Sequence, residues 1–212
     1  MLDKNKFVVK SASTLFSSKE GYEIVDPESN QVLGTAEVKS SFWGKIFGSI
    51  LGDENMSKTI EVCQTGSEAP VFSVRRSGFF IKKIQALDEA GQVVGSYKAK
   101  AFSLSGGYHI YDKDGNHVAE IKGNLFKADY KFLTPSGEEM GSVSQSWGGL
   151  AKALLTGAGT YGVEIAPAYD HLPTAKMLIL GAAIAIDSLF KTKKSTASKG
   201  AEMAAKTVTP EE

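Results

Sequence analysis

The side chains that could do chemistry in this sequence are few, and their spacing does not match a known metal site. Histidine, the commonest metal ligand, occurs at His109, His117 and His171. His109 and His117 would face each other across one predicted hairpin, but no carboxylate or third ligand follows from the sequence. A structural role is therefore expected for the histidines, and no metal site is predicted.

The sequence motifs for calcium binding, phosphate binding and nucleophilic catalysis are either incomplete in this chain or missing from it. "DKDG" (Asp112–Gly115) imitates the start of an EF-hand loop, but its twelfth position is Gly123 rather than Glu, so it predicts a turn. "GAGTYG" (157–162) precedes a predicted strand, which is the wrong order for a phosphate-binding loop. Cys63 lies in the alternating "KTIEVCQ" and is expected to be packed. The sequence has no G-x-S-x-G motif, P-loop or paired-carboxylate signature, so it predicts a non-enzymatic protein without a cofactor.

Four cations bracket a predicted hairpin turn at Ser77-Gly78: Arg75, Arg76, Lys82 and Lys83. A two-residue turn would project Arg75 and Lys82 from one face and Arg76 and Lys83 from the other. Cations on adjacent strands can hold an anionic lipid headgroup, such as that of a phosphoinositide, through charge-assisted hydrogen bonds. The alternative, a solvated charged hairpin, is the commoner outcome for such residues.

The segment "FWGKIFGSILG" (Phe42–Gly52) has the apolar spacing of an amphipathic helix. Its apolar residues fall on one helical face: Trp43, Ile46, Phe47, Ile50 and Leu51. This face could lie in a membrane interface with its tryptophan at the level of the headgroups. The alternative is a helix that caps one end of the protein, which is the more usual fate of an amphipathic stripe.

A repeated hairpin organises the elements that would position these residues. Four segments share an apolar start, a polar turn and a small residue at the end: 22–34, 84–95, 108–119 and 130–141. Their turns combine Asp, Pro and Gly, which suit turn formation, and the flanks alternate with period two. With "FVVK", "KTIEVCQ", "PVFSVRRSGFFIKKI" and "TYGVEI", roughly a dozen strands result. A mainly β fold, a closed antiparallel barrel or a sandwich, is predicted.

"MLILGAAIAI" (Met177–Ile186) is the most apolar run of the chain. It is too short for a bilayer crossing, which needs about twenty residues, and no polar stripe interrupts it. We predict a slim helix over about 175–190 that fills the middle of the barrel through Met177, Leu178, Leu180, Gly181, Ile184 and Ile186. The small residues Gly95, Ala119 and Gly141 are where strands would pass close to it.

These segments resemble one known family. Hairpin copies ending in "G-x-x-x-G", followed by "SVSQSWGGLAKALL", "TYGVEIAPAYD" and "AKMLILGAAIAID", are similar to the phospholipid scramblase and LURP-one-related group of the tubby-like superfamily. The likeness covers about Phe7 to Phe190. It implies a twelve-stranded barrel threaded by a buried C-terminal hydrophobic helix, and association with phospholipid.

The chain departs from the animal scramblases of that group at the positions tied to calcium and acylation. The proline-rich arm and the cysteine cluster are missing, and Cys63 stands alone. Where the group has an acidic calcium-binding segment, this chain offers only Glu164 and Asp170, whereas calcium takes six to eight oxygens. The resemblance therefore implies the fold more strongly than calcium-driven scrambling.

The balanced charge of the chain argues against partners that are bound through a strong net electrostatic field. There are 24 Lys+Arg and 24 Asp+Glu among 212 residues, so no nucleic-acid partner is expected. With a single cysteine and no signal peptide, we expect a cytoplasmic protein, or one peripheral to a membrane. Residues 1–190 are predicted as the barrel domain and residues 191–212 as a flexible polar tail.

Three functions remain open from the sequence. The first is a non-enzymatic protein that binds phospholipid, phosphoinositide headgroups or a protein partner at a membrane surface. The second is a soluble scaffold or regulatory protein without lipid contact, and the third is a scramblase with an inserted C-terminal helix. The oligomeric state does not follow from the sequence.

Overall fold

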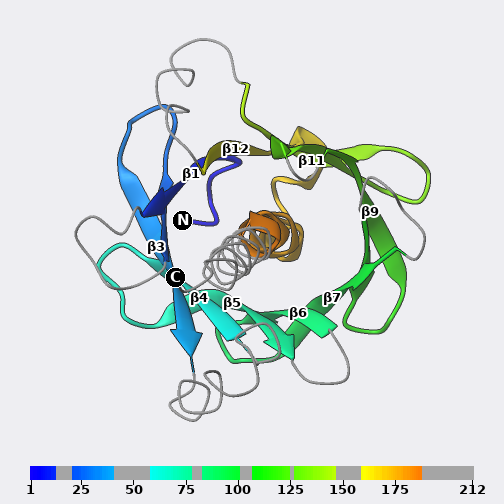
Figure 1. Cartoon of the computed structure of the whole chain (residues 1–212), viewed down its shortest axis with the longest axis horizontal. Helices are drawn as coiled ribbons and strands as arrows, with labels where there is room; N and C mark the ends of the chain where they lie inside the picture. Colours follow the sequence, from blue (N-terminus) through cyan, green and yellow to red (C-terminus); the bar gives the residue numbers. More distant parts are fainter. Residues whose placement is uncertain are drawn as a thin grey trace, which may run out of the picture.

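Twelve antiparallel strands close into one barrel around a central helix (Figure 1). The computed structural model describes residues 1–12, 21–40, 58–77, 83–100, 107–124, 127–146 and 159–187. The strands are β1 (Lys6–Ala12), β2 (Gly21–Val25), β3 (Val32–Ser40), β4 (Lys58–Gln64), β5 (Pro70–Ser77), β6 (Lys83–Asp88), β7 (Val93–Ala99), β8 (Tyr108–Asp112), β9 (His117–Asn124), β10 (Asp129–Leu133), β11 (Glu139–Ser144) and β12 (Thr160–Ile165). Each strand pairs with its neighbours in sequence, and β1 pairs with β12 to close the ring. The predicted barrel is confirmed.

The strands follow from the period-two alternation in the sequence. In β10, Tyr130 and Phe132 are buried in the core, while Asp129 and Lys131 face solvent. Such alternation specifies the register, because a slip by one residue would turn the apolar set outward. The barrel therefore has one apolar inner face and one polar outer face.

Aspartates close the repeated hairpins. Asp112 Oδ1 accepts hydrogen bonds from the backbone N–H groups of Asp114 at 2.9 Å and Asn116 at 2.8 Å. Asp88 Oδ1 does the same for Ala90 and Gln92 at 3.0 and 2.8 Å. Gly115 adopts φ +85°, which a residue with a Cβ rarely adopts. "DKDG" is therefore a turn, as predicted.

A helix over residues 173–187 runs along the barrel axis, starting slightly earlier than the predicted 175. Pro173 stands at its first position, where a missing N–H costs nothing. Leu180 and Ile184 are 0% exposed, which confirms the predicted interior position. Within the part of the chain that the structure describes, no helix is both long and apolar enough to span a bilayer.

Small residues let the wall and the helix approach closely. A Cβ added at Gly95 would lie 2.7 Å from Leu178 Cδ2, and one at Gly141 would lie 3.2 Å from Ile179 Cδ1. Ala119, in the equivalent place of the third repeat, is buried in the core. The Tyr97 hydroxyl donates to the Leu178 carbonyl at 2.9 Å, so the helix is also held by a buried hydrogen bond. The predicted close approach to the helix is confirmed for Gly95 and Gly141, and for Ala119 it stays a prediction.

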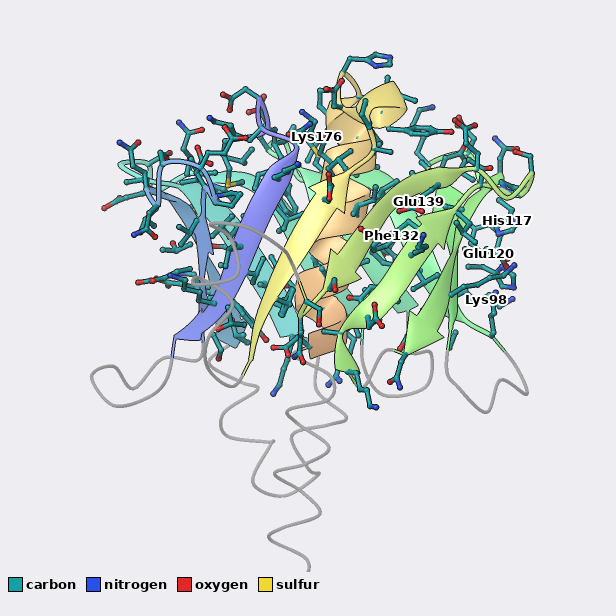
Figure 2. The ribbon with its side chains drawn as sticks, turned by 90° about the horizontal axis from the view of Figure 1, so that it is seen from above. Lys98, His117, Glu120, Phe132, Glu139 and Lys176 are labelled. Atoms are coloured by element: carbon teal, nitrogen blue, oxygen red, sulfur yellow. The ribbon has the colours of Figure 1, made fainter. Side chains whose placement is uncertain are left out.

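The barrel has two different ends. At one, which we call the turn end, short connections over residues 26–31, 65–69, 89–92, 113–116 and 134–138 join neighbouring strands. The central helix begins there and runs toward the other end (Figure 2). Lys176, in the first turn of the helix, is 3% exposed and donates from Nζ to the Leu2 carbonyl at 2.9 Å. The N-terminal residues are thereby attached to the helix at the turn end.

Candidate lipid-facing surface

Acidic side chains gather at the turn end. Among the described residues of its connections and of the strand positions beside them, the acids are Asp3, Asp26, Glu28, Glu68, Asp88, Glu89, Asp112, Asp114, Glu138, Glu139, Glu164 and Asp170. The basic residues of the same regions are Lys4, Lys6, Lys113 and the buried Lys176. Part of this acidity arises because aspartate builds turns: Asp26, Asp88 and Asp112 accept backbone hydrogen bonds there.

Basic side chains gather at the opposite end, which we call the basic end. In and beside the strand segments that end there, the basic residues with described side chains are Lys10, Lys39, Lys58, Arg75, Arg76, Lys98, Lys100, Lys122, Lys127 and Lys131. The described acids in the same segments are Glu23, Glu37, Glu61, Glu120, Asp129 and Asp187. The basic residues outnumber the acids here, so a chain with no net charge is polarised along the barrel axis.

Some of these cations are neutralised by neighbours on the outer face. Glu120 on β9 binds Lys100 at 2.6 Å and also pairs with Lys122. The hydrogen bond from Lys100, and then that from Lys122, lowers the pKa of Glu120 to about 2. Lys131 pairs with Glu139 at 2.6 Å. Lys98 and Glu120 lie on the outside of the barrel, below His117 (Figure 2).

Other cations of the basic end form no ion pair with the described residues. They are Lys10, Arg75, Lys98 and Lys127. Arg75, Lys98 and Lys127 are exposed. Because Val74 and Tyr97 point into the core, strand alternation directs Arg75 and Lys98 outward. These charges are open to an anionic partner.

Two further cations occupy the inner side of the barrel at this end. Lys58 and Arg76 are directly opposite each other on β4 and β5. They share the face of Ile60 and Val74, which point into the core. Both are half-buried and engaged in interactions. The inner rim at the basic end thus carries two cations, and both have interaction partners.

The predicted turn at Ser77-Gly78 is wrong. Ser77 pairs with Lys83, so the connection spans residues 78–82 rather than two residues. Arg75 is then opposite Gln85, and Arg76 is opposite Ile84. Arg75 therefore shares its strand face with the position of Lys83, and the predicted pairing of Arg76 with Lys83 on one face is also wrong. Lys82 lies outside the described residues.

The amphipathic segment also lies outside the described residues, with Trp43, Ile46, Phe47, Ile50 and Leu51. Its attachment points are described. Ser40, the last residue of β3, pairs with Lys58, the first residue of β4. Residues 41–57 therefore connect two strands at the basic end. The lipid-binding role of these residues stays a prediction.

The sequence analysis missed Lys10, Lys98 and Lys127 as members of a common surface. They are far apart in sequence and become neighbours of one rim only when the barrel closes. A signal was present, however. Within the repeats the acids precede or occupy the turns, and the lysines lie toward the end of the second strand, as in "YKAK" and "IKGN".

The described residues include side chains of metal-ligating and nucleophilic types. They contain no group of three or more His, Cys, Asp or Glu side chains that could hold a metal ion. Burial raises the pKa of the Cys63 thiol, and the thiolate is the nucleophilic form. Cys63 Sγ lies 3.7 Å from the Glu68 carbonyl oxygen, a weak contact in the wall of the barrel. The surface described above suits binding rather than covalent chemistry.

Comparison with known proteins gave one family and one structure. The family model described as Scramblase matches residues 14–192. A solved X-ray structure of a protein from Arabidopsis thaliana is similar, with 10% sequence identity, a TM-score of 0.47, and coverage of 85% of this chain and 91% of that one. No curated protein matches the chain.

Proposed function

Because the chain belongs to the Scramblase family, we propose that it is a non-enzymatic protein that binds phospholipid at a membrane surface. The basic end of the barrel faces anionic headgroups, and the turn end faces away. The single observation that carries the proposal is the separation of charge along the axis, with Arg75, Lys98 and Lys127 exposed at one end and acidic turns at the other.

The expected interaction energy is large enough for reversible binding. A Lys or Arg close to an anionic bilayer contributes about 1 kcal/mol, and the effect falls off within a Debye length of about 8 Å at physiological salt. Four cations without ion pairs would contribute about 4 kcal/mol, or roughly a thousandfold in affinity. The acids of the turn end lie at the far side of the barrel, where the same field is weak.

The position of the central helix favours binding at the surface over insertion. Leu180 and Ile184 are enclosed by the barrel wall, and insertion of the helix would expose the inner faces of all the strands. That apolar area stabilises the fold at about 25 cal/mol per Å². The segment with Trp43 and Phe47 connects β3 and β4, which end and begin at the basic end, and its sequence pattern is that of an interfacial helix.

Vesicle flotation tests the proposal. We expect the protein to float with vesicles that contain phosphatidylserine and to float much less with pure phosphatidylcholine. The double variant Arg75→Glu/Lys98→Glu should bind the anionic vesicles at least about tenfold more weakly, because four units of charge change at the lipid-facing end. The matched control, Lys6→Glu/Lys113→Glu, makes the same charge change at the turn end and should leave binding nearly unaltered.

The other functions predict different results. A soluble scaffold would not float with either kind of vesicle. A scramblase with an inserted helix would resist carbonate extraction, whereas a surface-bound barrel is extracted. Equal loss of binding in both double variants would show that only net charge matters, and the assigned orientation would then be wrong.

A further inference from the structure

Two histidines on the outer face of the barrel lie in direct contact. His109 on β8 and His117 on β9 place Nδ1 and Nε2 3.0 Å apart. Their ring centroids are 4.7 Å apart, with the planes at 80°. Tyr111 packs beside both rings, at 5.6 Å from His117 and 6.4 Å from His109. The β-bulge between Ile110 and Tyr111 sets this arrangement, because it changes the register of the two strands.

We propose that His109 and His117 chelate a transition-metal ion, with Cu(II) as the preferred ion and Ni(II) as the second. A metal bound at about 2.0–2.1 Å from two nitrogens that are 3.0 Å apart subtends an angle of about 90°. That angle fits two neighbouring positions of a square-planar or octahedral ion. A tetrahedral zinc ion would need the nitrogens about 3.4 Å apart.

The ligand type agrees with this geometry. Imidazole nitrogens suit copper, nickel and zinc, and affinity for a given set of such ligands rises toward Cu(II). The pair occupies two coordination positions, and the exposed side of His117 leaves the others to water. The site is thus an open chelate on a rigid hairpin, distinct from a closed structural metal centre.

The protonation states also fit. The metal needs a lone pair on His109 Nδ1 and on His117 Nε2, so the ring protons take the tautomers His109 Nε2–H and His117 Nδ1–H. Burial first, then Lys100, His117 and Lys98, lower the pKa of His109, while Glu120 opposes them. This direction favours the neutral ring, which is the form that binds a metal ion.

The surrounding charges set an upper limit on affinity. Lys98 is directly opposite His109 in the sheet, and Lys100 and Lys122 lie near Glu120, which pairs with both. Since Glu120 cancels only part of this positive charge, the neighbourhood weakens the attraction for a dication. We therefore expect the histidine pair to bind Cu(II) more weakly than a centre with four protein ligands does.

Copper titration tests the site independently of lipid binding. The probe is Cu(II) alone, with binding followed by calorimetry and by the nitrogen hyperfine pattern of its electron paramagnetic resonance spectrum. His109→Gln and His117→Gln should each weaken the strongest site at least about tenfold, since each removes one of two ligands. His171→Gln, which changes the exposed histidine of the turn end, should bind as the parent does.

The N-terminal amine can also bind copper, but it contributes equally in all five proteins and does not affect the comparison. Two-nitrogen imidazole hyperfine structure in the parent and in His171→Gln, reduced to one nitrogen in His109→Gln and in His117→Gln, supports the chelate. The proposal is overturned if the parent and the double variant His109→Gln/His117→Gln bind Cu(II) equally. Tighter binding of Zn(II) than of Cu(II) would overturn the assigned metal geometry.

Discussion

The two ends of this barrel carry opposite charge for different reasons. At the turn end, Asp88 and Asp112 each accept two backbone hydrogen bonds, so their charge is a consequence of folding the hairpins. At the basic end, Lys98 and Lys127 are exposed and form no ion pair with the described residues. The folding of the hairpins accounts for these two acids, whereas no described ion pair accounts for these cations. This difference is the reason to assign the binding surface to the basic end.

The helix that joins the two ends should show the largest effect. Ile184 is 0% exposed among the strands. An aspartate there would be a buried carboxylate without a partner, and its cost of several kcal/mol is comparable to the whole stability of a domain. Ile184→Asp should therefore unfold the protein, as seen by circular dichroism. Leu172→Asp, which changes a residue 41% exposed just before the helix, should melt like the parent. A folded Ile184→Asp variant would contradict the central position of the helix.

The second-largest loss of stability is expected at the contact between the barrel wall and the central helix. Alanine at Gly95 would place Cβ 2.6 Å from the Tyr111 carbonyl oxygen and 2.7 Å from Leu178 Cδ2. The backbone oxygen cannot yield easily, so Gly95→Ala should reduce the free energy of unfolding by about 1–3 kcal/mol. Urea denaturation measures this loss. In Gly137→Ala the added Cβ would lie in open space, and the only cost is the strained φ of +89°. The loss in the free energy of unfolding should therefore be smaller than for Gly95→Ala.

Alanine substitutions at the two ends test the comparison directly. Asp88→Ala removes the acceptor of two backbone N–H groups, and we expect a loss of about 1–2 kcal/mol in the free energy of unfolding. Lys98→Ala should leave the melting temperature unchanged and weaken flotation with anionic vesicles. If Lys98→Ala instead destabilised the protein as much as Asp88→Ala, the cation would have a structural role and the distinction between the ends would fail.

The smallest effect concerns Glu120, which binds Lys100 and Lys122 on the outer face. Because its pKa is lowered to about 2, its stabilising contribution is present above its ordinary pKa of about 4.5 and is lost as pH falls toward about 2. Glu120→Gln should lower the melting temperature slightly at pH 7 and flatten its pH dependence over that window. The pair with the exposed Lys122 is worth at most about 1 kcal/mol. An unchanged acid profile would show that the pairs contribute nothing.

Local chemistry explains what the sequence alone could predict. Alternation and turn residues act over a few neighbours, so "KTIEVCQ" and "TYGVEI" could be assigned as strands, and they are β4 and β12. The lack of any polar stripe in "MLILGAAIAI" placed the helix inside before any contact was known. The wrong turn at Ser77-Gly78 has an equally local cause, because a Ser-Gly pair is a common turn signal and the pairing of Ser77 with Lys83 is not visible in it.

The sequence by itself thus determined the elements, the repeated hairpins and the apolar helix, since each of these depends on residues that are close together in the sequence. Only the tertiary structure decided which residues share an end of the barrel. Lys10, Lys98 and Lys127 become one surface because β1 pairs with β12 and closes the ring. The 3.0 Å contact between His109 and His117 likewise depends on a bulge that shifts the register. Closure and register are properties of strand pairing as a whole, and no single segment of the chain encodes them.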